Sequence, residues 1–317
     1  MSDLMTKPSA ASGPATAGPG AGAARRRRRR HDPTARGVWP FALPAVLVTA
    51  VLVLVPVAYA IWLSVSDRQA DGTNSGFLGF ANYADMFGNP EFWNSLKITL
   101  FLFVVCLLVE TVLGLALGYV MSLDVPGRRI FQGMMLIPAI TASVAVGLVW
   151  LLIMDPTLGA ANQLLGKVGI DPVVWLGDPD IAPWSIALVD IWQWTPFMAL
   201  IIAAGIRSLP EEPFEAAAID GASGWRTAWN IGLPLLRPVL TVAMLLRTVD
   251  LVRFFDTIYI MTQGGPVNST NTLNVYGYNA GFVDQEPSYA AALQIALLAL
   301  VVVIAGAFTW FRQRASQ

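Results

Sequence analysis

The sequence predicts an all-α integral membrane protein, and three observations indicate this fold class. Of the 317 residues, 55% are hydrophobic and only 13% are charged, whereas about a quarter of the residues in a soluble domain are charged. The mean hydropathy is +0.58. Six apolar segments are also long enough to cross a bilayer, which takes about 20 residues. We therefore expect a bundle of six transmembrane helices.

The six predicted spans differ in how many charges they carry. They cover residues 41–65, 94–123, 130–154, 183–207, 238–262 and 288–311. The first, third and sixth contain no charged side chain, whereas the second contains Glu110 and the fourth Asp190. The fifth contains four charges, so its composition alone is a reason to reject it as a span.

The residues before the first span predict a basic tail. Residues 1–24 are mostly Ala, Gly, Pro, Ser and Thr, a composition that favours disorder, and we assign residues 1–38 to this tail. Arg25–Arg30 and His31 suit either a nucleic-acid-binding tail or a cytoplasmic retention signal, and their position just before a span favours the signal. The apolar run is too long for a cleaved signal peptide. Residues 39–317 form the predicted membrane domain.

The distribution of positive charge predicts the orientation, because cytoplasmic loops are enriched in Lys and Arg. With the N-terminus inside, the cytoplasmic positions are Lys7, Arg25–Arg30, Arg36, Arg128, Arg129, Arg226, Arg237, Arg312 and Arg314. The outer loops then hold only Arg68 and Lys167. We therefore expect both termini in the cytoplasm, and the bias also favours keeping the fifth span.

Several kinds of chemistry have no support in the sequence. The single cysteine, Cys106, excludes an intramolecular disulfide framework, and the single histidine, His31, makes a histidine metal site implausible. There is no phosphate-binding loop and no recognisable hydrolase motif. The net charge of −1 gives no reason to expect a nucleic-acid partner. We expect a chain that is not an enzyme and that binds no metal or cofactor itself.

A mixed polar segment at about 208–238 separates the fourth and fifth spans on the predicted cytoplasmic side. Pro210 and Pro213 lie where a short helix would begin, and Gly221 suits its end. A second amphipathic stretch, Trp225–Leu233, precedes Pro234, which we expect to end it together with Pro238. The residues alone equally allow an amphipathic loop that lies on the inner leaflet.

Two motifs carry a resemblance to a known family. The motif Glu215-Ala216-Ala217 is followed, after three intervening residues, by Gly221 and, after nine more, by Ile231-x-Leu233-Pro234. This pattern resembles the EAA loop of inner-membrane subunits of ABC importers. Asp220-Gly221-Ala222 looks like the form found in the carbohydrate branch, although Trp229 stands where Phe is frequent. The run "FFDTIYIMTQGGPVNSTNTL" at 254–273 resembles a segment of maltose-type permeases. The resemblance covers essentially all of the chain after residue 38.

The resemblance implies a type I ABC importer permease with a cytoplasmic coupling helix. Such a subunit forms half of the pathway for a sugar or sugar-like solute in a bacterial cell membrane. The implied partners are a second homologous permease, two ATPase subunits that bind ATP and Mg, and an extracellular or periplasmic solute-binding protein. The residues that it assigns to ATPase coupling are Glu215, Ala216, Ala217, Asp220, Gly221, Ile231, Leu233 and Pro234.

The solute pathway is predicted on the fourth and fifth spans. Helical spacing places Arg247, Asp250, Leu251 and Phe254 on one face, and this face resembles by its position the one that lines the sugar site of maltose-type permeases. In the fourth span, Gln193, Trp194 and Phe197 would face it. We expect Asp256 to point away from this face and to be structural.

The charges within the spans have a second interpretation, which is pairing that assembles the bundle. From the rise of a helix, Glu110 and Arg247 lie at similar depths, as do Asp190 and Arg253. We expect Glu110, Asp190 and Arg253 to pair, and we keep the Arg247–Asp250–Phe254 face for the pathway.

Other functions remain open at this point. The same architecture suits the import of glycerol phosphate or another polar solute, and Arg247 and Arg253 would allow an anion. A secondary transporter or channel without ATPase partners is a different class, and it would not require an EAA loop. A membrane anchor without transport fits poorly with charges inside the spans.

Overall fold

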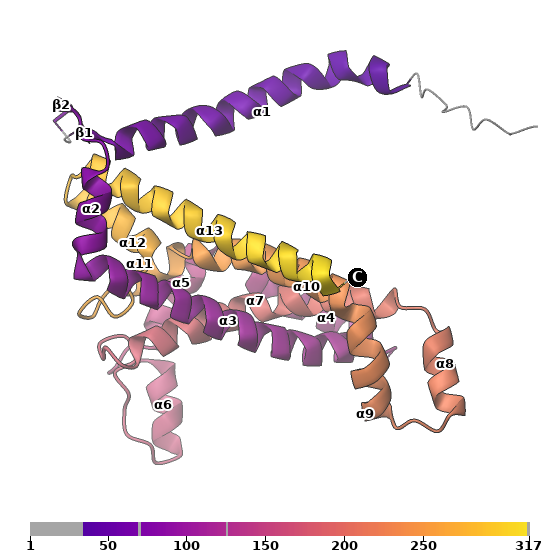
Figure 1. The fold of residues 1–317 in the computed structure, drawn as a ribbon. Coiled ribbons are helices and arrows are strands. Elements are labelled where there is room, and N and C mark those ends of the chain that lie inside the picture. Colours follow the sequence, from indigo (N-terminus) through magenta and orange to yellow (C-terminus); the bar gives the residue numbers. More distant parts are fainter. Residues whose placement is uncertain (1–33, 69–70, 125, 316–317) are drawn as a thin grey trace, which may run out of the picture. The chain divides into compact units, whose positions relative to one another are not determined.

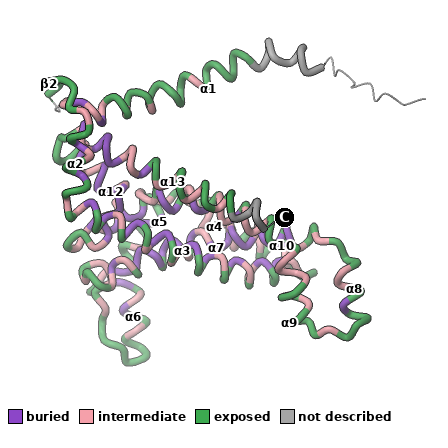
Figure 2. The backbone as a smooth tube through the Cα atoms, in the orientation of Figure 1, coloured by how far each residue is buried: buried purple, intermediate pink, exposed green. Residues whose placement is uncertain are grey.

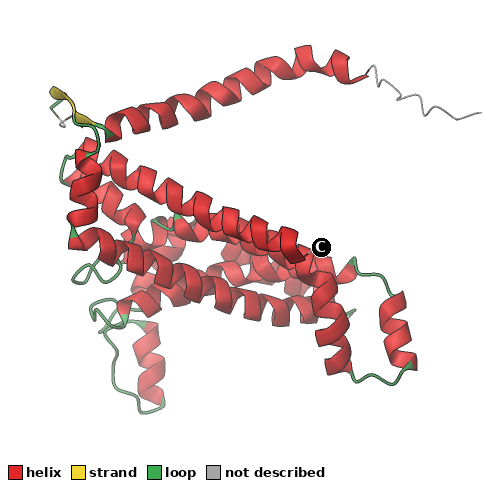
Figure 3. Ribbon diagram, viewed as in Figure 1, coloured by secondary structure: helices red, strands yellow, loops and turns green. Residues whose placement is uncertain are grey.

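The computed structural model describes residues 34–68, 71–124 and 126–315, so most of the predicted tail lies outside the described residues. The described chain is helical apart from one antiparallel pair of short strands, β1 (Ser66–Arg68) and β2 (Asn74–Phe77) (Figure 3). It groups into two units, residues 1–53 and 54–317, whose boundary falls within α1 (Thr34–Ser64). All other elements belong to the second unit.

Four of the predicted spans are continuous helices. Within the described residues, four helices are long and apolar enough to cross a membrane: α1, α3 (Pro90–Ser122), α7 (Ala182–Arg207) and α13 (Pro287–Ala315). They correspond to the first, second, fourth and sixth predicted spans. The start of α3 shows why the sequence begins a helix there: the side chain of Asn89 accepts a hydrogen bond from the Glu91 amide, and Pro90 occupies the first turn.

The third predicted span is not one continuous helix but is bent in its middle. Its residues form α4 (Arg128–Ile140) and α5 (Ser143–Ile153), which meet at 93°. Thr141 and Ala142 between them are extended, with ψ near 137° and 132°. The Gln193 side chain of α7 reaches this bend and donates to the Thr141 carbonyl at 3.2 Å. A backbone acceptor freed by the bend is thereby satisfied within the protein, as a low-dielectric environment requires.

The fifth predicted span is also interrupted. It forms α10 (Leu233–Val252) and α11 (Asp256–Met261), separated by Arg253–Phe255. α10 carries more charge than the apolar composition of a simple span allows, yet it packs against α3, α7 and α13. A test for spans that counts charged residues rejects α10, because such a count does not show whether the charges are paired inside the bundle.

The core lies between α3, α7, α10 and α13, and buried residues follow their facing sides (Figure 2). α3 and α7 pack closely at Gly118, where an added Cβ would lie 2.8 Å from a methyl carbon of Ile202. Only glycine therefore fits this crossing without displacing Ile202. Leu102 of α3 and Ile186 and Met198 of α7 are also almost fully buried.

The segment between α11 and α13, which lies between the fifth and sixth predicted spans, is helical in its second half. The chain forms α12 (Leu273–Tyr278) followed by a π-helical turn, η2 (Asn279–Val283). The Leu273 amide donates to Thr99 Oγ1 of α3 at 2.9 Å, and Val275 and Tyr276 are buried. Two further short helices, α2 (Ala81–Gly88) and α6 (Ala160–Lys167), lie in the other two predicted outer loops.

Candidate functional site

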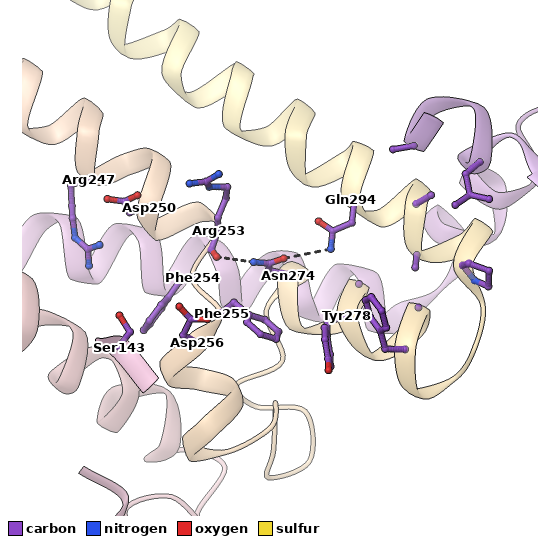
Figure 4. A pocket seen from close by; sticks show the side chains of 18 of the residues that line it. Ser143, Arg247, Asp250, Arg253, Phe254, Phe255, Asp256, Asn274, Tyr278 and Gln294 are labelled. Atoms are coloured by element: carbon purple, nitrogen blue, oxygen red, sulfur yellow. Dashed lines mark hydrogen bonds between the residues drawn. The ribbon is translucent and has the colours of Figure 1, made fainter. Parts of the chain in front are cut away.

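A cavity of about 830 Å³ lies where α10 gives way to α11. Its wall combines polar and aromatic side chains from several elements, including Asp250, Arg253, Phe254, Asp256, Asn274 and Gln294 (Figure 4). Ser143, at the bend between α4 and α5, and Trp194 of α7 complete the wall near Arg247. A concave site with a few polar groups among aromatic rings suits a small solute.

Arg247 links the cavity to a buried ion cluster. Its Nε donates to Glu110 Oε2 at 2.7 Å and its Nη2 to Glu110 Oε1 at 3.0 Å, while the same Nη2 also pairs with Asp190. The exposed fractions are 2% for Arg247, 0% for Glu110 and 1% for Asp190. The guanidinium carbon lies 5.0 Å from the centre of the Trp194 ring, within cation–π range. Three helices, α3, α7 and α10, are thus joined by one arginine.

The break after α10 opens backbone groups toward the cavity. The Arg253 carbonyl accepts a hydrogen bond from Asn274 Nδ2 of α12 at 2.7 Å. Asn274 Oδ1 in turn accepts from Gln294 Nε2 of α13 at 3.4 Å (Figure 4). This chain of amides supplies the partner that a continuous helix would have given the Arg253 carbonyl, and it fixes α12 and α13 to the break.

The predicted pathway residues separate into two groups. Trp194, Arg247, Asp250 and Phe254 all line the cavity. The other three are placed elsewhere: Gln193 is buried against the Thr141–Ser143 bend, Leu251 is buried in the core, and Phe197 packs edge-on against Trp194. Helical spacing identified the face of α10 that lines the cavity. It could not show that Leu251, on the same face, is buried in the core.

The predicted ion pairs are correct for Glu110 and wrong for Arg253. Glu110 pairs with Arg247, as its depth indicated. Asp190 pairs with Arg247 rather than with Arg253, which is exposed and lines the cavity. Asp256 also lines the cavity, contrary to the expectation that it points away. Both errors have one cause: the helix stops at Val252, so helical spacing cannot be extended to residues 253–256.

Sequence reasoning missed Asn274 and Tyr278, because their segment lies between the predicted spans, and it also missed Gln294, which lies inside the sixth predicted span. A signal was present in α12 and its continuation, where Asn274 and Tyr278 are four residues apart, as are Gly277 and Gly281. Such spacing places side chains on one helical face. Within the described residues, no three His, Cys, Asp or Glu side chains group in a way that could hold a metal ion.

The polar insert forms two short helical arms that project from the ends of the long helices (Figure 1). The first arm is α8 (Glu212–Ile219), with Pro213 in its first turn. Gly221 follows with φ of +72°, and this left-handed conformation confirms the turn predicted there. The second arm begins with α9 (Gly224–Thr227), whose N-cap is Ser223.

The second arm continues without interruption into α10 through a π-helical turn, η1 (Ala228–Gly232). The expectation that Pro234 and Pro238 end this arm was wrong. Pro234 lies where the π-helical turn passes into α10 and Pro238 lies inside α10, so neither proline ends the helical stretch, although each removes one amide donor from it. The second arm of the polar insert and the helix that carries Arg247 are therefore one helical stretch.

The predicted coupling residues occupy different surfaces of the two arms. Glu215, Ala216 and Asp220 are exposed on α8 or its end, and Ala217 is buried. Ile231, Leu233 and Pro234 are half-buried at the base of the second arm. Trp225 and Trp229 are exposed and stack at 5.6 Å. Ile219, at the end of α8, is exposed as well, and sequence spacing did not single out these apolar side chains.

The helical membrane fold, the central cavity and the projecting loop define a transport subunit. The chain belongs to the family described as binding-protein-dependent transport system inner membrane component, whose sequence profile matches residues 110–317. It is a multi-pass membrane protein and a permease subunit of a binding-protein-dependent ABC importer.

Individual relatives are named for different cargoes. The chain is 34% identical over 262 residues to the trehalose/maltose transport system permease protein MalF of Thermococcus litoralis, covering 83% of this chain and 88% of that protein. It is 32% identical over 266 residues to the sn-glycerol-3-phosphate transport system permease protein UgpA of Agrobacterium fabrum, covering 82% and 89%. The fold is similar to a chain of a bacterial alginate ABC transporter crystallised in complex with an alginate pentasaccharide-bound periplasmic protein, with a TM-score of 0.77, 20% identity and 90% and 96% coverage.

Proposed function

We propose that the chain forms half of the translocation pathway for a sugar or sugar-like solute. The observation that carries this proposal is the composition of the cavity wall, which contains the aromatic side chains of Trp194, Phe254 and Tyr278 together with the amides of Asn274 and Gln294. Ring faces pack against the C–H surface of a sugar, and amides exchange hydrogen bonds with its hydroxyls. The name of the trehalose/maltose relative agrees with this chemistry.

We propose further that transport is driven by separate ATPase subunits that bind ATP and Mg and dock on the two-armed loop. Exposed apolar side chains at its tip, Ile219, Trp225 and Trp229, are suited to burial against a partner. A second homologous permease would complete the pathway, and an external solute-binding protein would deliver the solute. In this arrangement both termini and the loop face the cytoplasm.

The test is uptake by the complete importer in liposomes, with radiolabelled trehalose as the neutral probe and sn-glycerol-3-phosphate as the anionic probe. We expect accumulation of the neutral probe that requires ATP. Preferred accumulation of sn-glycerol-3-phosphate would favour the alternative cargo. Uptake that persists without ATP would instead indicate a secondary transporter and would contradict the coupling proposal.

A further inference from the structure

The buried cluster beside the cavity brings two acidic side chains to one base. Glu110 of α3 and Asp190 of α7 both bind Arg247 of α10, and a single nitrogen, Nη2, donates to Oε1 of Glu110 at 3.0 Å and also to Oδ2 of Asp190. The three residues are at most 2% exposed. Two carboxyl groups therefore converge on one guanidinium in a region that bulk water does not solvate.

The surroundings of the cluster supply no second cation among the described side chains. The strongest electrostatic influences on Glu110 come from Asp190 and Arg247, and the Cys106 thiol of α3 faces the same three groups. Of the other helices packed on α3, α7 and α10, α5, α12 and the 287–310 part of α13 contain no charged residue. The charged residues of the remaining helices take no part in the ion pairs of the cluster; these are Asp85 of α2, Arg128 and Arg129 of α4, and Asp256 of α11.

The two acids are bound unequally. Glu110 accepts two hydrogen bonds from Arg247, one from Nε at 2.7 Å and one from Nη2, which is the bidentate geometry of a carboxylate on an arginine. Asp190 accepts through Oδ2 alone, whereas its Oδ1 is buried without a hydrogen-bond partner. A charged oxygen left unpaired away from water is far more costly than a neutral one. Oδ1 of Asp190 is therefore an oxygen open to a proton.

The charge count leads to the same conclusion. If both acids were ionised, the cluster would keep one uncompensated negative charge inside the bundle, and two carboxylates would repel each other beside the same nitrogen. When two acids share a buried site, the ionised form of one disfavours that of the other. One added proton brings the summed charge of Glu110, Asp190 and Arg247 to zero.

We propose that Glu110 and Asp190 form a proton-binding site in the bundle, which holds one proton between them at neutral pH. The proton belongs to the pair, because acids that interact this closely titrate as a unit. The junction of α3, α7 and α10 is then electrically neutral. This inference goes beyond the proposed function, since it requires neither a particular solute nor an ATPase partner.

Infrared spectroscopy tests this site directly, because the C=O stretch of a protonated carboxyl group is separate from the bands of carboxylates and amides. The samples are the purified importer with the wild-type chain, with Glu110→Gln or with Asp190→Asn, at neutral pH in a detergent without ester groups. Each variant leaves one carboxylate opposite one guanidinium, so the extra proton is no longer needed. We expect a protonated-carboxyl band in the wild type that is lost in both variants.

The matched control is Asp250→Asn, which removes an exposed acid of the cavity wall outside the cluster. We expect this variant to keep the band. Wild-type and cluster-variant spectra that do not differ in this region overturn the proposal, since both acids would then be ionised. Loss of the band in only one of the two cluster variants overturns it as well, because the proton would then belong to one acid regardless of its neighbour.

The pH dependence of unfolding reports the same proton by another route. Both acids are ionised in the unfolded chain above about pH 6, so unfolding of the wild type releases one proton there. Between about pH 6 and pH 8 the folding equilibrium constant of the wild type should therefore fall by about tenfold per pH unit relative to either cluster variant. The measured quantity is the Tm of the importer in detergent at several pH values.

We expect the Tm of the wild type and of Asp250→Asn to fall more steeply with rising pH than that of Glu110→Gln or Asp190→Asn. Equal slopes in all four proteins contradict the proton site. Absence of ATP-driven uptake in the wild type would count against the proposed function only.

Discussion

Arg247 shows how a single residue can make a charged helix compatible with a membrane bundle. Taken alone, its guanidinium and the carboxylates of Glu110 and Asp190 would each be costly to remove from water. Together they share hydrogen bonds while almost fully buried, and they join α3, α7 and α10. Replacing Arg247, the shared partner of both carboxylates, should therefore lower the stability of the protein more than replacing an exposed charged residue.

We expect Arg247→Leu to destabilise the protein strongly, by about 3–5 kcal/mol, because two buried carboxylates lose their cation. The measurement is thermal unfolding of the purified importer in detergent, followed by tryptophan fluorescence. Arg253→Leu is the matched control, since that side chain is exposed and we expect a much smaller shift in Tm. Equal shifts for both variants would show that the buried cluster is not a major source of stability.

For the individual charged residues, the sequence predicted one of the two ion pairs of the buried cluster. The helical rise placed Glu110 and Arg247 at one depth, and the structure pairs them. Depth alone also suggested Asp190 with Arg253, but a helix break redirected residues 253–256 toward the cavity, so Arg247 became the partner of Asp190. Rotation about a helix axis and the end of a helix depend on packing with distant segments, which spacing along the chain does not contain.

Among the elements, the two-armed loop depends on one backbone conformation. Gly221 has φ of +72° and no side chain near its Cβ position, so a substitution there strains the backbone without a clash. Such strain costs about 1–3 kcal/mol. We expect Gly221→Val to leave the protein in the membrane but to reduce uptake per ATP hydrolysed, measured in liposomes containing the complete importer.

The control for this prediction is Gly224→Val, three residues further on. Its Cβ position is equally free of neighbours, but its φ is not in the left-handed region. Transport coupling that fails in both variants alike would show that bulk at the loop matters rather than the turn at Gly221. Normal coupling in Gly221→Val would contradict the role assigned to this turn.

The contact between α3 and α7 yields a second prediction at the level of elements. Gly118→Leu introduces a side chain where even a Cβ would lie 2.8 Å from Ile202, and overpacking of this kind typically costs about 1–3 kcal/mol. We expect a lower Tm and a lower yield of folded protein in detergent. Gly133→Leu, at a position with no neighbour within 4 Å, is the control. A comparable loss in both would exclude close packing at Gly118 as the cause.

Four long helices could be predicted because length and apolar composition are sufficient for a continuous span. The bend at Thr141–Ala142 and the break at Arg253–Phe255 could not, since each depends on an amide from another helix. Gln193 satisfies the first and Asn274 the second. The sequence contains these amides but does not show which backbone carbonyls they reach.

For the whole molecule, the distribution of arginine predicts the orientation in the membrane. We expect Asn230→Cys, on the two-armed loop, to be protected from a membrane-impermeant thiol reagent in intact cells and labelled after permeabilisation. Lys167→Cys, at the exposed end of α6, should be labelled in intact cells. The reverse pattern would invert the topology and place the loop out of reach of a cytoplasmic ATPase.

The uninterrupted helix from Gly224 to Val252 determines where this part of the chain can bend. A hydrogen-bonded helix resists bending, whereas residues without helical hydrogen bonds bend more easily. The nearest non-helical residues beyond the loop are Arg253–Phe255, in the wall of the cavity. If a docked partner displaces this arm, as proposed above, the first place beyond α10 where the chain can bend is therefore Arg253–Phe255, beside the cavity.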